Sequence, residues 1–238
     1  MNLTIVLATL RQRFTSPIRL VLLLVIGWMP MMAILLAPTT GFAVLGDCHF
    51  LALALAAGMI GQDVASGTLQ LVLSRPVTRT GYVLSKWLAV TGGTLALVAL
   101  QVGVATLIIL VRGAHVPWDE AVLYLANSAL LAAGAAAVMA LLSALVPGLG
   151  DLGLLLLAFL SAQVLGAVGA HQQWSVMVSA ADELQRTLKP ELNLAPLFHG
   201  QPVSWLAVVA YLSTVTLCLA AAAVVMNRRE FSYASTGA

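Results

Sequence analysis

Long apolar segments make up most of this chain and restrict what it can fold into. A transmembrane α-helix needs about 20 apolar residues to cross about 30 Å of hydrocarbon. Only 8% of the residues are charged and the mean hydropathy is +1.01, whereas about a quarter of an ordinary soluble domain is charged. Six segments are long enough to span, at 18–37, 42–61, 87–111, 121–146, 150–170 and 203–226. The sequence therefore predicts an all-α membrane protein, a single polytopic domain over residues 1–238 with six transmembrane helices.

The basic residues predict the orientation of these spans. Loops rich in Lys and Arg stay in the cytoplasm. Eight of the eleven basic residues lie on one side: Arg11, Arg13, Arg19, Arg75, Arg79, Lys86, Arg228 and Arg229. The other side holds Arg112, Arg186 and Lys189. We therefore expect cytoplasmic N- and C-termini and a cytoplasmic loop at residues 62–86.

Two further segments have helical periodicity without the length of a span. Before residue 15, one side of a helix carries the apolar residues Leu3, Val6, Leu7, Leu10 and Phe14, with Ile5 outside the pattern. This predicts an amphipathic helix in the cytoplasmic interface with its arginines toward lipid headgroups; the alternative is an extension of the first span. In the outer loop 171–202, an apolar repeat from Trp174 to Leu188 predicts a second interfacial helix before the sixth span.

The polar stretch 62–86 is where a soluble partner could bind. Its sequence is QDVASGTLQLVLSRPVTRTGYVLSK. We expect residues 62–74 to continue as a helix past the membrane surface and to present Leu69, Val72 and Leu73 to an apolar groove on a partner. The alternative is a solvated loop whose arginines contact lipid phosphates.

The order of residues in this stretch resembles that of ABC-2 type transporter permeases. The matching elements are Asp63, Gly67-Thr68, Leu69-Leu71-Leu73, Pro76-Val77-Thr78-Arg79 and Lys86. The resemblance implies a coupling helix that docks on a separate ATPase subunit, with Asp63, Gly67, Thr68, Leu69, Leu73, Arg75, Pro76, Arg79 and Lys86 at the docking site.

The resemblance also implies a place and a function. It implies a bacterial inner-membrane permease of an ABC exporter, which works as a dimer with a second copy or a paralogue and forms the substrate path in contact with membrane lipid. The chain has no G-x-x-x-x-G-K-[ST] run, so ATP and Mg²⁺ would belong to the P-loop ATPase partner. We expect no enzymatic activity, no cofactor and no nucleic acid on this chain. Alternatives are a non-conducting anchor or regulatory subunit for an ATPase, and the permease of a metal-cofactor maturation system.

Ionisable and polar groups within the apolar segments are candidates for a substrate path. These are Asp47 and His49, beside Cys48, and Gln163. Adjacent helical residues point about 100° apart, so Asp47-Cys48-His49 could hold a metal only with ligands from elsewhere. We expect Asp47 and His49 to lie at the outer headgroup level, where water satisfies them, and Gln163 to make an interhelical hydrogen bond. No metal site is predicted.

Overall fold

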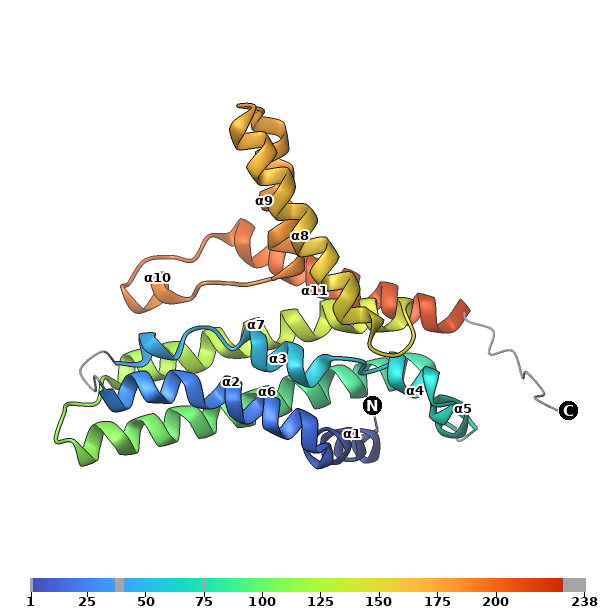
Figure 1. The fold of residues 1–238 in the computed structure, drawn as a ribbon, viewed down its shortest axis with the longest axis horizontal. Coiled ribbons are helices and arrows are strands. Elements are labelled where there is room, and N and C mark those ends of the chain that lie inside the picture. Colours follow the sequence, from blue (N-terminus) through green and yellow to red (C-terminus); the bar gives the residue numbers. More distant parts are fainter. Residues whose placement is uncertain (1, 37–40, 75, 229–238) are drawn as a thin grey trace, which may run out of the picture.

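The computed structural model describes residues 2–36, 41–74 and 76–228, and the regular structure in these ranges is helical (Figure 1). Five helices of the described chain are long and apolar enough to cross a membrane. They are α2 (Pro17–Leu36), α6 (Arg79–Val111), α7 (Trp118–Leu145), α8 (Gly150–His171) and α11 (Trp205–Arg228). The protein is thus a multi-pass helical membrane protein, and five of the predicted spans correspond to these helices.

Shorter elements connect or flank the long helices. They are α1 (Leu3–Thr15), η2 (Phe42–Leu45), α3 (His49–Ala56), α4 (Gly61–Ala65), α5 (Thr68–Leu73), α9 (Ser175–Leu188) and α10 (Ala195–Phe198). Residues 79–86, predicted to lie in a loop, form the first turns of α6 instead, because the Thr78 hydroxyl accepts a hydrogen bond from Gly81 N–H and caps the helix there.

Helix α7 is the central element of the bundle. It packs against α6, α11 and α3, and its buried face is rich in alanine, with Ala132, Ala135, Ala136 and Ala137 fully buried. Small side chains let helix backbones approach closely and so gain packing contacts in a membrane. The alanine-rich run therefore places α7 where several helices meet.

The predicted span at 42–61 is not one continuous helix, so six transmembrane helices are not confirmed. It is divided into η2, α3 and α4, with turns between them. Helix α3 has eight residues, which at about 1.5 Å per residue is much shorter than the hydrocarbon layer. The segment nevertheless lies against α2, α6 and α7 inside the bundle, so its irregular backbone is buried in protein.

Side chains from neighbouring helices bind the backbone groups that the break between α3 and α4 leaves free. The Ala57 carbonyl accepts hydrogen bonds from Arg13 Nη1 and, at 3.2 Å, from Arg19 Nη2. On the other side of the break, Ile60 and Gly61 N–H donate to Ser143 Oγ at 3.0 and 2.9 Å. Non-helical backbone is tolerated at membrane depth only where such partners exist.

The turn between α7 and α8 completes this arrangement. Gly58 N–H, in a residue with φ of +64°, donates to Asp151 Oδ2 at 2.6 Å. Gly148 N–H donates to the Gly61 carbonyl at 2.7 Å. A Cβ added at Gly61 would lie 2.7 Å from the carbonyl oxygens of Val146 and Gly148. The break and the turn are therefore in direct backbone contact, which a larger residue at position 61 would prevent.

Helix α1 forms as predicted but faces the bundle differently. Thr9 and Arg13 are its buried residues, and Ile5, one turn earlier on the same side, packs against the core. Leu3 and Leu7 are exposed. The expectation that the arginines point toward headgroups is wrong for Arg13, which is 2% exposed. Its guanidinium lies inside the bundle instead, where it donates a hydrogen bond to the Ala57 carbonyl.

Helices α8 and α9 form an antiparallel hairpin that stands out from the remaining bundle (Figure 1). The predicted helix after residue 174 is present, and its apolar side covers α8. Gly166 and Gly169 of α8 allow this close contact, because Cβ atoms there would lie 3.5 Å from Ala181 Cβ and 2.9 Å from Met177 Cβ. The opposite side of α8 exposes large apolar residues, including Leu156, Leu157 and Leu160.

The contact between Gly61 and the α7–α8 turn can be tested by two glycine-to-alanine substitutions. We expect Gly61→Ala to destabilise the protein by about 1–3 kcal/mol, because the neighbouring atoms are backbone and cannot rotate away. Gly92→Ala in α6 is the matched control, since a Cβ there meets no atom within 4 Å, and helix propensity favours alanine by up to about 1 kcal/mol. Unfolding in detergent measures both; equal stability of the two variants would contradict the packing described here.

Candidate functional site

The polar stretch after the break folds into two short helices joined by a glycine turn. Gly67 has φ of +71°, a left-handed conformation that glycine adopts without steric cost and that ends α4. The Thr68 hydroxyl donates to the Asp63 carbonyl at 3.3 Å and holds the turn. The prediction of one continuous helix over 62–74 is therefore wrong, and α5 begins in a new direction.

Asp63 and Lys86 form a buried ion pair beneath this turn. Lys86 Nζ lies 2.7 Å from Asp63 Oδ2, and their side chains are 4% and 10% exposed. The Tyr82 hydroxyl donates to the same carboxylate oxygen at 2.5 Å. Lys86 and Tyr82 belong to α6 and Asp63 to α4, so the pair attaches the start of the polar stretch to the longest helix. Neither charge is exposed for direct contact with a partner.

The buried arginine of α1 lies within the electrostatic field of this ion pair. Burial lowers the pKa of Arg13 to about 10, and the charge of Arg19 acts in the same direction, while Asp63 and Asp151 raise it. Arg13 is therefore still a cation at neutral pH. Three cations (Arg13, Arg19 and Lys86) and two carboxylates lie in this region, which leaves one excess positive charge.

The leucines of α5 divide between the core and the surface. Leu69 is 1% exposed and Leu71 is 71% exposed, while Val72 and Leu73 are half-buried against the core. The expectation that Leu69 faces outward is wrong, because the glycine turn rotates α5 relative to a continuous helix. Leu71 is the apolar residue of this helix that is most available to a partner.

A largely apolar groove lies beside Leu71, between α5 and the beginning of α1. It has a volume of about 330 Å³. Its walls are Asn2, Thr4, Ile5 and Ala8 from the α1 side and Leu71, Val72 and Val77 from the α5 side. The exposed Leu3 continues the apolar surface. The sequence indicated α5 as a docking element but gave no sign that α1 forms the other wall.

The remaining predicted docking residues lie near the same end of the bundle. Arg79 Nη1 donates to the carbonyls of Met226 and Asn227 at 2.8 and 2.9 Å, which ties the start of α6 to the end of α11. Pro76 is exposed. Arg75 lies outside the described residues. We refer to this end of the bundle, where Asn2, α5, the start of α6 and the end of α11 lie, as the α5 end.

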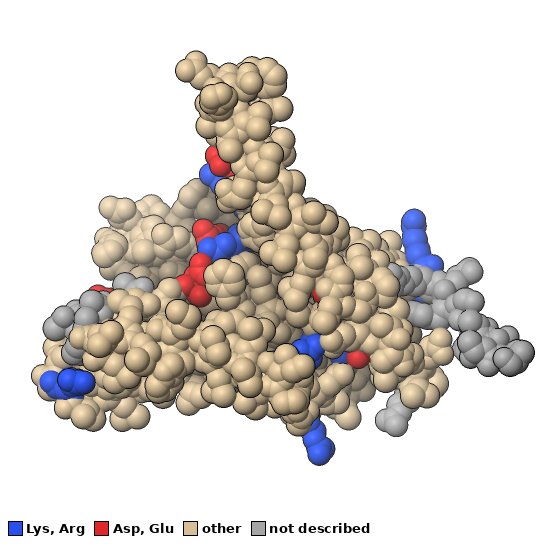
Figure 2. Space-filling model, viewed as in Figure 1, with Lys and Arg blue, Asp and Glu red and all other residues tan. Residues whose placement is uncertain are grey.

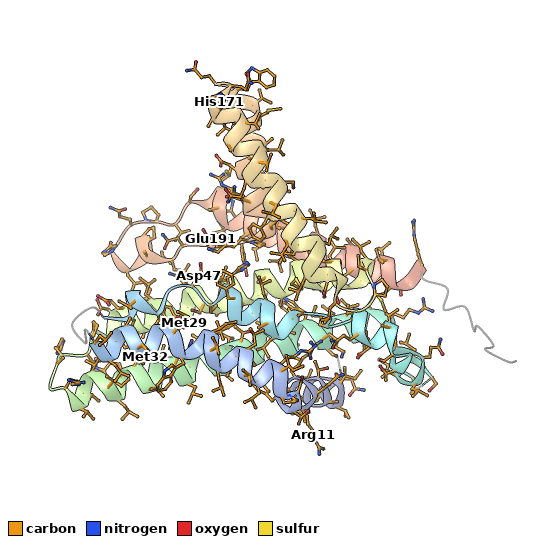
Figure 3. The ribbon with its side chains drawn as sticks, viewed as in Figure 1. Arg11, Met29, Met32, Asp47, His171 and Glu191 are labelled. Carbon is orange, nitrogen blue, oxygen red and sulfur yellow. The ribbon has the colours of Figure 1, made fainter. Side chains whose placement is uncertain are left out.

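Asp47 is at a second polar site, at the base of the α8–α9 hairpin (Figures 2 and 3). Lys189 Nζ lies 2.7 Å from Asp47 Oδ2 and 3.2 Å from Glu191 Oε2. Although partial burial acts to lower it, the hydrogen bond to Asp47 holds the pKa of Lys189 above its ordinary value. The pair joins segments that are far apart in the sequence. A cavity of about 310 Å³, with Asp47 and Glu191 in its wall, lies beside it.

The neighbours of Asp47 do not converge on a common point. His49 is 5% exposed, and neither of its ring nitrogens has a hydrogen-bond partner among the described residues. It lies edge-on to Phe50 and Phe159, so the expectation that water satisfies it is wrong. Cys48 Sγ instead donates to the Ser128 carbonyl at 3.4 Å. Within the described ranges, no three His, Cys, Asp or Glu side chains are placed to hold a metal ion.

Gln163 is on the exposed side of α8, away from the interhelical position that was expected for it. The structure instead assigns interhelical hydrogen bonds to Ser143 and Asp151, which sequence reasoning missed. Asp151 follows the Pro-Gly-Leu-Gly turn directly and could have been noticed as a carboxylate at the edge of a span. Ser143 gave no such signal, because a single serine in an apolar helix is common.

No family model, no curated protein and no solved structure matches this chain.

The buried ion pair can be tested by removing one charge and then both. We expect Lys86→Met to destabilise the protein by about 3–5 kcal/mol, because Asp63 is left buried without its counter-charge. The double variant Lys86→Met with Asp63→Leu should recover much of this loss. Arg186→Gln is the control, because the Arg186–Glu183 pair is exposed and such pairs contribute at most about 1 kcal/mol. Unfolding in detergent compares the stability of the wild type, Lys86→Met, the double variant and Arg186→Gln. A double variant no more stable than Lys86→Met would contradict the pairing.

Proposed function

We propose that this chain is the membrane-spanning permease subunit of an ATP-driven exporter of the ABC-2 type, and that it binds a separate ATPase at the α5 end. The observation that carries the proposal is the exposed Leu71 beside the apolar groove between α5 and α1. A soluble protein that inserts an apolar side chain into such a groove gains contact with both helices. The order of sequence elements from Asp63 to Lys86, which resembles that of ABC-2 type permeases, supports the same assignment.

The contacts behind the groove offer a route for coupling. The buried ion pair joins α4 to α6, and the Arg79 side chain joins α6 to α11. From α4, the chain leads directly into the break that α1, α2, α7 and α8 hold together. A force on α5 would therefore reach each of these helices through hydrogen bonds and ion pairs rather than through a flexible loop.

The exposed apolar surface supports the idea that this chain works with a second permease copy or a paralogue. The most apolar 18-residue part of helix α8 has a mean hydropathy of 2.1, yet only 17% of it is buried. Membrane lipid or a second copy would cover this surface, and a path between two copies would carry the cargo. We place the protein in the bacterial inner membrane with the α5 end in the cytoplasm, where its ATPase would bind ATP and Mg²⁺.

The docking role of Leu71 can be tested by adding a charge at two adjacent surface positions. We expect Leu71→Asp to weaken binding of the proposed P-loop ATPase partner by roughly 100-fold, because a carboxylate would have to be buried in an apolar contact. Gln70→Asp is the matched control: Gln70 is exposed on the same helix, outside the groove. Co-purification of both co-expressed variants with the ATPase gives the measurement.

Equal recovery of the ATPase with wild type and both variants would exclude docking through Leu71. A complex that forms normally but whose ATPase activity responds to no cargo would favour the anchor or regulatory subunit over the permease.

A further inference from the structure

A second groove, on the side of the bundle where α1 turns into α2, contains a guanidinium and apolar walls. It has a volume of about 430 Å³. Its polar part comes from Gln12, Ser16, Arg19 and Gln62, of which Arg19 is the charged residue. Much of the apolar part comes from Ile18, Leu22, Leu149 and Leu152. This groove is separate from the one beside Leu71, and the proposed docking surface does not include it.

Arg19 retains hydrogen-bonding capacity in this groove. Both of its hydrogen bonds are made by Nη2, to the Ala57 carbonyl at 3.2 Å and to Gln62 Oε1 at 2.6 Å. Its Nε and Nη1 have no acceptor among the described residues. The nearby carboxylate of Asp151 already accepts hydrogen bonds from Gly58 and Leu152 N–H. A guanidinium has five N–H donors in a fork that suits phosphate, so an anionic acceptor can still be added.

The surrounding charge favours an anion in the same place. Arg13 and Arg19 both bind the Ala57 carbonyl, so their two guanidinium groups lie close together, and the region carries one excess positive charge. The first turn of α2, which begins at Pro17, adds backbone N–H groups that have no intrahelical acceptor and the positive end of a helix dipole. The groove is thus electrically suited to a phosphate.

The apolar walls extend this site along the bundle surface. Ile18 is 82% exposed, Leu149 54% and Leu22 46%. Ile18 and Leu22 belong to α2, which is long enough to cross a membrane, and Leu149 lies in the turn directly before α8. A free phosphate would leave these side chains uncovered, whereas an acyl chain attached to the phosphate would cover them. A basic pocket between transmembrane helices is a recognised type of site for anionic lipid headgroups.

We propose that the groove at Arg19 binds one anionic phospholipid, with the headgroup phosphate on the Arg19 guanidinium and an acyl chain along Ile18, Leu22 and Leu149. Because Arg19 also binds the Ala57 carbonyl, the lipid contacts the residue that holds the α3–α4 break. The bound lipid therefore stabilises the packing of α1, α2 and α3 around this break. This site does not depend on the proposed transport function.

The test uses the purified full chain in a neutral detergent, titrated with phosphatidylglycerol or phosphatidylcholine and followed by native mass spectrometry. We expect one phosphatidylglycerol to bind about tenfold more tightly than phosphatidylcholine, because a charged donor gains an anionic acceptor. Arg19→Gln should remove this preference. Leu22→Trp should weaken phosphatidylglycerol binding by filling the groove without changing the Arg19–Ala57 contact, so the test holds even if Arg19→Gln does not fold.

Arg11→Gln is the matched control, because Arg11 is an exposed arginine of α1 outside the groove (Figure 3), and it should keep the lipid preference. Equal binding of the two lipids by wild type would overturn the proposal, as would equal losses in Arg11→Gln and Arg19→Gln or unchanged binding in Leu22→Trp. A third titration uses inorganic phosphate. Displacement of the lipid by millimolar phosphate would show a site for a soluble anion and would also overturn the lipid assignment.

Discussion

The bundle depends on the way in which four helices hold the break between α3 and α4. An apolar segment that stops being helical exposes carbonyl and N–H groups, each of which costs several kcal/mol if it meets hydrocarbon without a partner. Here the Ala57 carbonyl accepts hydrogen bonds from Arg13 and Arg19. The N–H groups that follow it donate hydrogen bonds to Ser143 and Asp151. These partners come from α1, α2, α7 and α8. The need to supply hydrogen-bond partners for one short stretch of backbone therefore fixes how these four helices are placed.

The charged groups buried in this protein are also satisfied by specific partners. Arg13 is bound to a backbone carbonyl, and Lys86 to Asp63 and the cation–π face of Tyr82. A buried ion pair seldom adds net stability over an apolar pair, but it penalises any arrangement that separates the partners. In this chain it selects one orientation of the polar stretch on α6. The start of the polar stretch, from which α5 continues, is therefore fixed to α6.

Some features of the polar stretch depend on the local sequence, and others depend on tertiary packing. The capping hydroxyl of Thr78 and the left-handed Gly67 are local signals, and each ends or begins a helix where it stands. The burial of Leu69 and the exposure of Leu71 are not local. They follow from the direction in which α5 leaves the glycine turn and from the surface it then meets. Ile5 shows the same limit: it is outside the apolar pattern of α1 because it faces the bundle together with Thr9 and Arg13.

The sequence by itself determined that the chain is a helical membrane protein and where five of its long helices lie. Those features follow from hydropathy over some 20 residues, which depends only on neighbours in the chain. The tertiary structure alone decided that the apolar segment at 42–61 is broken, that Arg13 points inward, and that Asp63 and Lys86 neutralise each other. A backbone break is stable only when side chains from distant segments reach its free groups, and the positions of those side chains exist only once the helices have packed.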